Sequence, residues 1–253
     1  MHPVLRLVNR NLTVSLNPGF LIWQVLFPLI YIFVVGFAYT SLIPGVTYNG
    51  EHVTYPAFLA TGMIGFNIMN STLVSGLIIW NDRRHGMFEQ IMSGPYTRMQ
   101  YVLANICTIG TVGMISAALI VGVGYPVFQE SVEFTLYTIP LIVFASVTGS
   151  VLFGSLAAII STRLTSSEGF NVVINTTFIF LAFASTAFYP AEGAPEGLGA
   201  VFYFNPLTYI VDAIRAGIFG GITPAVFVEM AALSAIAATL FVVAAKMMTK
   251  VDF

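Results

Sequence analysis

The chain alternates long uncharged apolar runs with short polar segments, and this pattern predicts helices that cross a membrane. The first run, residues 20–42, contains no charged residue. A helix of that length extends roughly 35 Å, because each residue rises about 1.5 Å, and this is enough to cross the hydrocarbon core of a bilayer. The expected fold class is therefore an all-α integral membrane protein with six transmembrane helices. Their predicted bounds are about residues 20–42, 56–80, 99–127, 136–162, 170–189 and 224–245.

The residues before the first span have a different periodicity. Val4, Val8, Leu12 and Leu16 recur at every fourth position, and polar residues lie between them. This spacing is typical of an amphipathic helix in the membrane interface. We therefore expect an N-terminal interfacial amphipathic helix over about residues 3–16, with a frayed terminus as the alternative.

A short helix is also predicted between spans five and six. Asn205-Pro206 favours a helix start and Gly220-Gly221 favours a helix end. The roughly sixteen residues between them cover only about 24 Å, too little to cross a bilayer comfortably. Asp212 and Arg215 lie three positions apart in this segment, where their side chains can pair. The pattern thus predicts a re-entrant external helical element that contains a structural ion pair, with a substrate site as the alternative role of the two charged residues.

The distribution of charge predicts how the chain is oriented. Only 8% of its residues are charged and 57% are hydrophobic, whereas roughly a quarter of the residues in soluble domains carry charge. Once the apolar runs are assigned as spans, nearly all basic residues fall on one side, and Arg215 is the exception. Lys and Arg accumulate on the cytoplasmic side of spanning segments, so we expect a multi-pass protein of a plasma or inner membrane with both termini in the cytoplasm. The basic residues of that side are Arg6, Arg10, Arg83, Arg84, Arg98, Arg163, Lys246 and Lys250.

The sequence argues against nucleic-acid and nucleotide chemistry. A net charge of -2 offers no surface for a polyanion, so nucleic acid is not an expected partner. A phosphate-binding P-loop needs a lysine in a glycine-rich loop, but Lys246 and Lys250 both lie outside any such loop. We expect this chain to bind no cofactor or metal. Because no internal repeat or linker divides the sequence, residues 1–253 are expected to form a single transmembrane domain.

An intramembrane enzyme is a weak alternative. A serine protease dyad needs a base within hydrogen-bond reach, but His2, His52 and His85 fall outside the predicted spans. The predicted spans contain one carboxylate, Glu229, whereas aspartic protease chemistry needs two that share a site. An ion-coupled transporter or a channel is the main alternative, although such proteins usually carry ionisable residues inside the bundle.

Three segments together resemble a known family of membrane proteins. They are the amphipathic entry helix, the charged stretch NDRRHGMFEQIMSGP over residues 81–95, and the late stretch NPLTYIVDAIRA over residues 205–216. In this order they resemble the ABC-2 family, the membrane subunits of bacterial and archaeal ABC exporters. The resemblance covers the whole chain in the order and length of its spans.

The resemblance implies a function and a set of partners. It implies a permease subunit that moves an amphipathic, lipid-like, drug or glycan substrate out of the cytoplasm. Two copies of an ABC ATPase subunit would bind ATP and Mg, so this chain would not itself be an enzyme. A second permease, most simply a copy of this chain in a homodimer, would complete the transporter among the membrane lipids.

The resemblance also assigns roles within the charged stretch. In the family, a coupling helix after span two has a Gly-x-x-Glu core and a later Pro, and it docks into the ATPase subunit. Apolar residues of this helix, with Phe88 exposed among them, are expected to enter a cleft of the ATPase, and charged neighbours to orient the contact. For Arg83 and Arg84 the alternative is a role in topology alone. The expected ATPase-coupling residues are Arg83, Arg84, Gly86, Met87, Phe88, Glu89, Ile91 and Pro95.

Overall fold

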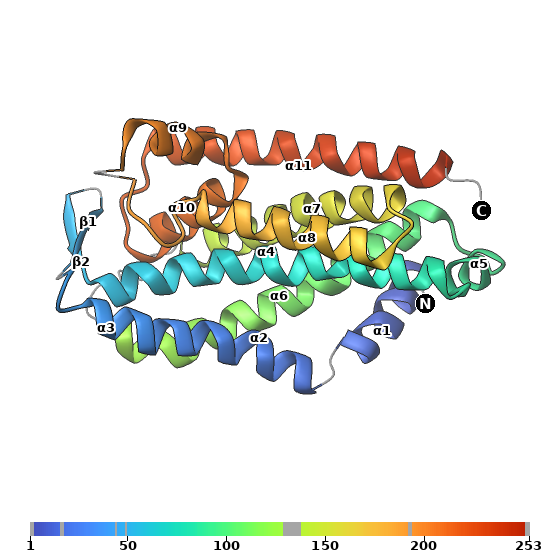
Figure 1. The fold of residues 1–253 in the computed structure, drawn as a ribbon, viewed down its shortest axis with the longest axis horizontal. Coiled ribbons are helices and arrows are strands. Elements are labelled where there is room, and N and C mark those ends of the chain that lie inside the picture. Colours follow the sequence, from blue (N-terminus) through green and yellow to red (C-terminus); the bar gives the residue numbers. More distant parts are fainter. Residues whose placement is uncertain are drawn as a thin grey trace.

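The computed structural model describes residues 3–15, 18–43, 45–48, 50–128, 138–191 and 194–250. Its long helices run side by side along the longest axis of the molecule and form a bundle (Figure 1). The elements are α1 (Pro3–Ser15), α2 (Pro18–Ile30), the π-helix η1 (Tyr31–Gly36), α3 (Phe37–Tyr39), β1 (Val46–Tyr48), β2 (Glu51–Val53), α4 (Tyr55–Arg84), α5 (Met87–Met92), α6 (Arg98–Phe128), α7 (Thr138–Arg163), α8 (Ser167–Phe183), α9 (Glu196–Phe204), α10 (Pro206–Ile218) and α11 (Pro224–Lys250).

Within the described residues, five helical segments are long and apolar enough to cross a membrane. They are Ile22–Tyr39, Tyr55–Arg84, Arg98–Gly122, Thr138–Arg163 and Pro224–Met248. The predicted fifth span is matched by α8, a shorter apolar helix of 17 residues that ends at Phe183 instead of residue 189. The fold is therefore all-helical in its membrane part, with five candidate spans and one shorter apolar helix. Residues 136 and 137 of the predicted fourth span lie outside the described residues.

One asparagine explains where α8 ends and α10 begins. The side-chain amide of Asn205 donates hydrogen bonds to the carbonyl oxygens of Leu181 and Ala184, at 2.8 and 2.7 Å. The last carbonyls of a helix lack partners within it, so these bonds stabilise the end of α8. The side-chain oxygen of Asn205 also accepts a hydrogen bond from the amide of Leu207 at 3.0 Å, which confirms its predicted role as the cap of α10.

The first span contains an irregular helical stretch. Pro28 lies inside α2, where it lacks the N–H group that would bond the preceding turn. The π-helix η1 begins three residues later, and α3 follows it. Such wider turns are found within helices where the regular hydrogen-bond ladder is interrupted.

The predicted loop after the first span contains a small β-hairpin. β1 pairs antiparallel with β2, and Val46 lies opposite Val53. Gly50 has a φ of 88°, which a residue without a side chain adopts at no steric cost. The sequence Asn49-Gly50 is itself a strong hairpin signal, so this element could have been predicted from the sequence.

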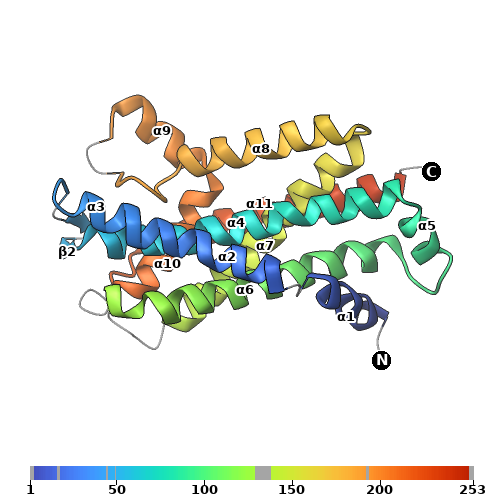
Figure 2. The same cartoon turned by 60° about the horizontal axis from the view of Figure 1, so that its bottom comes forward.

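The described part of the N-terminal segment is a helix, as predicted, and it packs onto the bundle. Leu7 and Asn11 of α1 are buried, and the Asn11 amide donates a hydrogen bond to the side chain of Asn105 in α6 at 3.2 Å. α1 lies at the same end of the bundle as α5 and the end of α11, which we call the α5 end (Figures 1 and 2). The opposite end, with β1 and β2, is the hairpin end. Leu16 of the predicted helix lies outside the described residues.

The centre of the bundle is α4, which is buried along most of its length. It contacts α6, α7 and α10. Gly62 allows α4 to lie directly against the segment after α8, because a Cβ atom there would lie 1.8 Å from the carbonyl oxygen of Ala187. Any other residue at position 62 would therefore force the segment after α8 away from α4.

Candidate functional sites: the α4–α6 connection and a polar pocket

The connection between α4 and α6 is a short helix held at the tip of a long helical hairpin. Gly86 precedes α5 with a φ of 71°, in the left-handed region that favours glycine. Figure 2 shows α5 beyond the turn between α7 and α8, at the far end of α4. The Gly-x-x-Glu spacing thus places Gly86 before the first turn of α5 and Glu89 in that turn.

Phe88 is buried, which corrects the expectation that it is exposed. Its side chain is 1% exposed and packs edge-on against Tyr101 of α6, with ring centroids 5.1 Å apart. The turn at Gly86 points Phe88 back toward the bundle, where it joins an apolar cluster. The other buried members of this cluster are Ile79, Tyr101, Val102, Ile106, Ala158, Ala244 and Met248. Phe88 therefore anchors α5 to Tyr101 of α6, within a cluster that also contains residues of α4, α7 and α11.

The remaining residues of the predicted coupling set divide into two groups. Met87 is 40% exposed, and Glu89 and Pro95 are also exposed. Ile91 is half-buried and packs against the cluster around Phe88. The surface that α5 presents outward therefore centres on Met87 and Glu89.

Arg83 and Arg84 reach the turn between α7 and α8. Arg83 Nη1 donates a hydrogen bond to the carbonyl oxygen of Ser161 at 2.5 Å, and Arg84 Nη1 donates one to that of Thr165 at 3.2 Å. The guanidinium of Arg84 also lies over the Trp80 ring, 5.2 Å from its centroid. Cations near a helix C-terminus stabilise its exposed carbonyls, so Arg83 holds the last turn of α7, and Arg84 holds the turn that follows it.

Asp82 connects α1 to the α4–α6 hairpin, a role that the sequence analysis missed. Its carboxylate is buried, accepts a hydrogen bond from the Tyr101 hydroxyl at 2.6 Å, and contacts Arg10 Nη2 with both oxygens at 3.3 Å. Arg10 belongs to α1 and Tyr101 to α6. No spacing rule relates positions 10, 82 and 101, so the sequence carried no signal for this contact.

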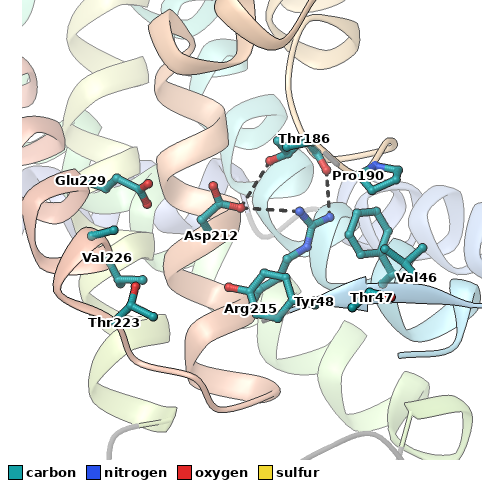
Figure 3. A pocket seen from close by; sticks show the side chains of 13 residues that line it. Val46, Thr47, Tyr48, Thr186, Pro190, Asp212, Arg215, Thr223, Val226 and Glu229 are labelled. Atoms are coloured by element: carbon teal, nitrogen blue, oxygen red, sulfur yellow. Dashed lines mark hydrogen bonds and ion pairs between the residues drawn. The ribbon is translucent and has the colours of Figure 1, made fainter. Parts of the chain in front are cut away.

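A polar pocket of about 210 Å³ lies at the hairpin end. Figure 3 shows the pocket, whose lining side chains come from β1, α4, the segment after α8, α10, the residue before α11, and α11 itself. Its polar members converge on one space and include two carboxylates. They are Thr47, Tyr48, Thr186, Asp212, Arg215, Thr223 and Glu229.

Asp212 and Arg215 are close together in this pocket, but their environments differ. Asp212 Oδ1 lies 3.6 Å from Arg215 Nη1. The Arg215 side chain is 2% exposed and that of Asp212 is 22% exposed. Asp212 also accepts a hydrogen bond from the Thr186 hydroxyl at 3.4 Å.

Arg215 is held by contacts on several sides. Its Nη2 donates to the carbonyl oxygen of Thr186 at 2.8 Å, and its Nε donates to the Thr61 hydroxyl at 3.3 Å. The guanidinium lies 3.7 Å from the centroid of the Phe58 ring, within the range of a cation–π interaction. This arginine therefore joins α10 to α4 and to the segment after α8.

Tyr48 brings a protonated hydroxyl to the pocket. Burial raises the pKa of Tyr48 well above its usual range, and the nearby carboxylate of Asp212 raises it further. Its ring also packs edge-on against Phe219, with centroids 5.9 Å apart. Tyr48 thus closes the pocket from the hairpin side as a neutral group.

The fold and these sites define a class: a multi-pass helical membrane protein with a short helix carried outside the bundle by two of its long helices. The sequence profile of the ABC-2 type transporter family matches residues 4–219 of the chain. The chain therefore belongs to this family and is the permease subunit of an ABC-2 type transporter. Permeases of this kind lack the ATPase, and ATP binding generally lies on a separate subunit with which they pair. Membership of this family argues against the two alternatives from the sequence, an ion-coupled transporter or channel and an intramembrane enzyme.

Individual relatives agree with this assignment at low identity. The chain is 26% identical over 207 residues to a protein of Pyropia yezoensis that is named as the transport permease ycf38, covering 79% of this chain and 67% of the relative. It is 26% identical over 201 residues to nodulation protein J of Rhizobium leguminosarum bv. viciae, covering 76% of this chain and 72% of the relative.

Proposed function

We propose that this chain is half of the membrane part of an exporter, a single transmembrane domain that works with a second copy of itself and two ATPase subunits. The cargo would be amphipathic, lipid-like, a drug or a glycan, moved out of the cytoplasm by ATP hydrolysis on the partner subunits. The near absence of charge from the long helices supports such a cargo, because little there would hold a small ion.

In this proposal α8 is the fifth of six spans, and the α5 end lies in the cytoplasm. The basic residues support this orientation. Arg83, Arg84 and Arg98 all lie at the α5 end, and the side chain of Arg98 reaches the carbonyl oxygen of Met248 near the end of α11 at 2.9 Å. Positive charge at one end of the spans is typical of the cytoplasmic side. The pocket with Asp212 and Arg215 would then face outward, and its ion pair would serve to hold the re-entrant helix α10.

The observation that best supports coupling to an ATPase is the construction of α5. It presents Met87 and Glu89 outward, while Phe88 between them is fixed in a cluster shared with α6, α7 and α11. A force applied to the outer face would be carried through Phe88 to these helices, because close-packed side chains shift together. In the proposed mechanism, closure of the ATPase subunits moves α5, and α5 moves the spans.

The exposed polar residues of α8 support the proposal that a second permease is present. Asn171, Asn175 and Thr176 are exposed on this apolar helix, where the Asn175 amide donates a hydrogen bond to the carbonyl oxygen of Asn171 at 2.8 Å. Figure 2 shows that α8 runs along one edge of the bundle. Polar amides are costly to expose to hydrocarbon, since water is not present there to bond them. A second permease or the cargo pathway between two permeases would cover this face.

The test is ATP hydrolysis by the purified complex of permease and ATPase. Glu89→Ala and Met87→Ala should lower substrate-stimulated hydrolysis sharply, because removal of a central contact commonly costs about 2 kcal/mol or more at an interface. Their own effect on the folding of the permease should be small, since both side chains are exposed. Glu168→Ala, which removes an exposed carboxylate from the first turn of α8, is the matched control.

The variant Phe88→Ala distinguishes the role of a buried anchor from that of the exposed contact surface. It should also impair coupling, but with a loss of permease stability of about 3 kcal/mol or more, because it empties a buried site. The proposal fails if the two exposed substitutions leave hydrolysis and transport at the wild-type level, or if no ATPase subunit co-purifies with the permease.

A further inference from the structure

A second hollow lies beside the end of α4, away from the outer face of α5. It has a volume of about 180 Å³ and is lined by Trp80, Arg83, Arg84, Leu164 and Thr165. Two of these five residues are arginines, and one is an aromatic of the kind found at membrane surfaces. We propose that this hollow binds the phosphate headgroup of an anionic phospholipid. The inference does not depend on whether α5 contacts an ATPase.

Arg84 has the geometry of a phosphate ligand that is already positioned. Its guanidinium is held over Trp80 and donates one hydrogen bond to Thr165. A guanidinium carries five N–H donors in a planar fork that matches a phosphate group. The contacts with Trp80 and Thr165 restrain this guanidinium on a side chain that remains exposed to solvent.

Arg83 adds a second positive charge on the same side. It is anchored by the carbonyl oxygen of Ser161, and Arg163, which is exposed, follows two residues later in the chain. Glu168 is an exposed carboxylate of the same turn region. The residues that line the hollow include two arginines and no carboxylate, and the neighbouring Asp82 carboxylate is paired with Arg10, so the local charge favours an anion.

The position of the hollow indicates a lipid source for that anion. Trp80 ends the apolar run of α4, and the polar residue Asn81 follows it. Trp80 also stacks on Phe170 of α8, with ring centroids 5.9 Å apart, which gives the hollow an aromatic wall. In Figure 1 the turn between α7 and α8 is set back from α5 toward the level of α1, the amphipathic helix. Basic pockets between helices at this level are typical sites for lipid headgroups.

A bound headgroup would link α4 to the start of α8. One side of the hollow is the last turn of α4, and the other is the turn that precedes α8. A phosphate between them would add to the hydrogen bonds by which Arg83 and Arg84 already join the two sides. The lipid would thus act on the helix whose polar face we assign to the second permease.

The experiment measures lipid binding to the full-length permease in detergent by native mass spectrometry, with phosphatidylglycerol and phosphatidylcholine as probes. The wild-type chain should retain phosphatidylglycerol in preference to phosphatidylcholine. Arg84→Gln should weaken phosphatidylglycerol binding about tenfold, the loss expected for one charge-assisted hydrogen bond. Arg84→Lys should restore part of it, because the charge returns without the planar fork.

Arg6→Gln is the control, because it removes one positive charge from an exposed position of α1 outside the hollow. It should leave lipid binding and the melting temperature unchanged. Arg84→Gln loses contacts with Trp80 and Thr165, so its melting temperature should fall, and binding is measured well below the melting temperature of every variant. Equal retention of both lipids, or equal effects of Arg84→Gln and Arg6→Gln, would overturn the proposal. Displacement of the lipid by inorganic phosphate at equal concentration would assign the site to a free anion instead. Loss of ATPase binding in Arg84→Gln with unchanged lipid binding would assign it to the protein partner.

Discussion

Replacing Arg215 with Met should destabilise the protein more than replacing Asp212 with Asn, although the two residues form one ion pair. Arg215 is almost fully buried and donates hydrogen bonds to Thr186 and Thr61. Each hydrogen bond from a charged group contributes about 1.5–3 kcal/mol, and a desolvated cation–π contact such as that with Phe58 about 2 kcal/mol. Because Met retains part of the apolar packing, we expect a net loss of about 4 kcal/mol.

Asp212 should contribute less, because water reaches its carboxylate through the pocket. Its side chain is 22% exposed and its oxygen lies 3.6 Å from Arg215, a long separation for an ion pair. Asp212→Asn keeps the shape of the side chain and removes only the charge, so we expect a loss of about 2 kcal/mol. The remaining contacts of Arg215 partly compensate for the missing counter-charge.

A double-mutant cycle in detergent measures the coupling between the two. Thermal or denaturant unfolding of the two single variants and the double variant should give an interaction free energy of about 1–2 kcal/mol, with the double variant costing less than the sum. Arg163→Met, an exposed arginine at the other end of the bundle, is the control and should be near neutral. Additivity within about 0.5 kcal/mol would contradict the pairing. A larger loss for Asp212→Asn than for Arg215→Met would refute the argument that burial determines the difference.

Two further predictions concern packing and orientation. Gly62→Ala should prevent normal assembly of the bundle, because its new methyl group would overlap a backbone carbonyl. The control is Gly197→Ala, where a Cβ meets nothing within 4 Å, and it should give wild-type yield and melting temperature. Equal yields and melting temperatures for the two variants would show that the contact at α4 is looser than described. In a Cys107→Ala background, a cysteine at the exposed position His52 should react with a membrane-impermeant thiol reagent in intact cells and one at Glu168 should not; the reverse pattern would invert the proposed orientation.

The membrane part of the fold was largely predictable, because lipid forces long runs of apolar residues into helices. The position at which α8 ends shows the limit of that reasoning. The hydropathy of residues 170–189 contains no stop signal, whereas α8 ends at Phe183, and its end is stabilised by hydrogen bonds from Asn205, more than twenty residues later. Hydropathy averaged over a short window of sequence cannot reveal a hydrogen-bond partner that lies more than twenty residues away. The same holds for Asp82, whose contacts lie on α1 and α6.

Phe88 shows a different limit, which bears on how coupling segments are interpreted. Six residues make fewer than two helical turns, so the pattern Met87-Phe88-Glu89 does not reveal which apolar side chain faces inward. Exposure was inferred for Phe88 from its polar neighbours, but the left-handed turn at Gly86 directs it to Tyr101 instead. The consequence is mechanical. In the proposed mechanism, an exposed aromatic would lose its effect when the partner dissociates, whereas a buried one would keep α5 attached to the spans and leave the contact with the partner to Met87 and Glu89. A coupling helix built in this way can transmit movement in both directions, so changes among the spans should also alter the affinity of α5 for its ATPase.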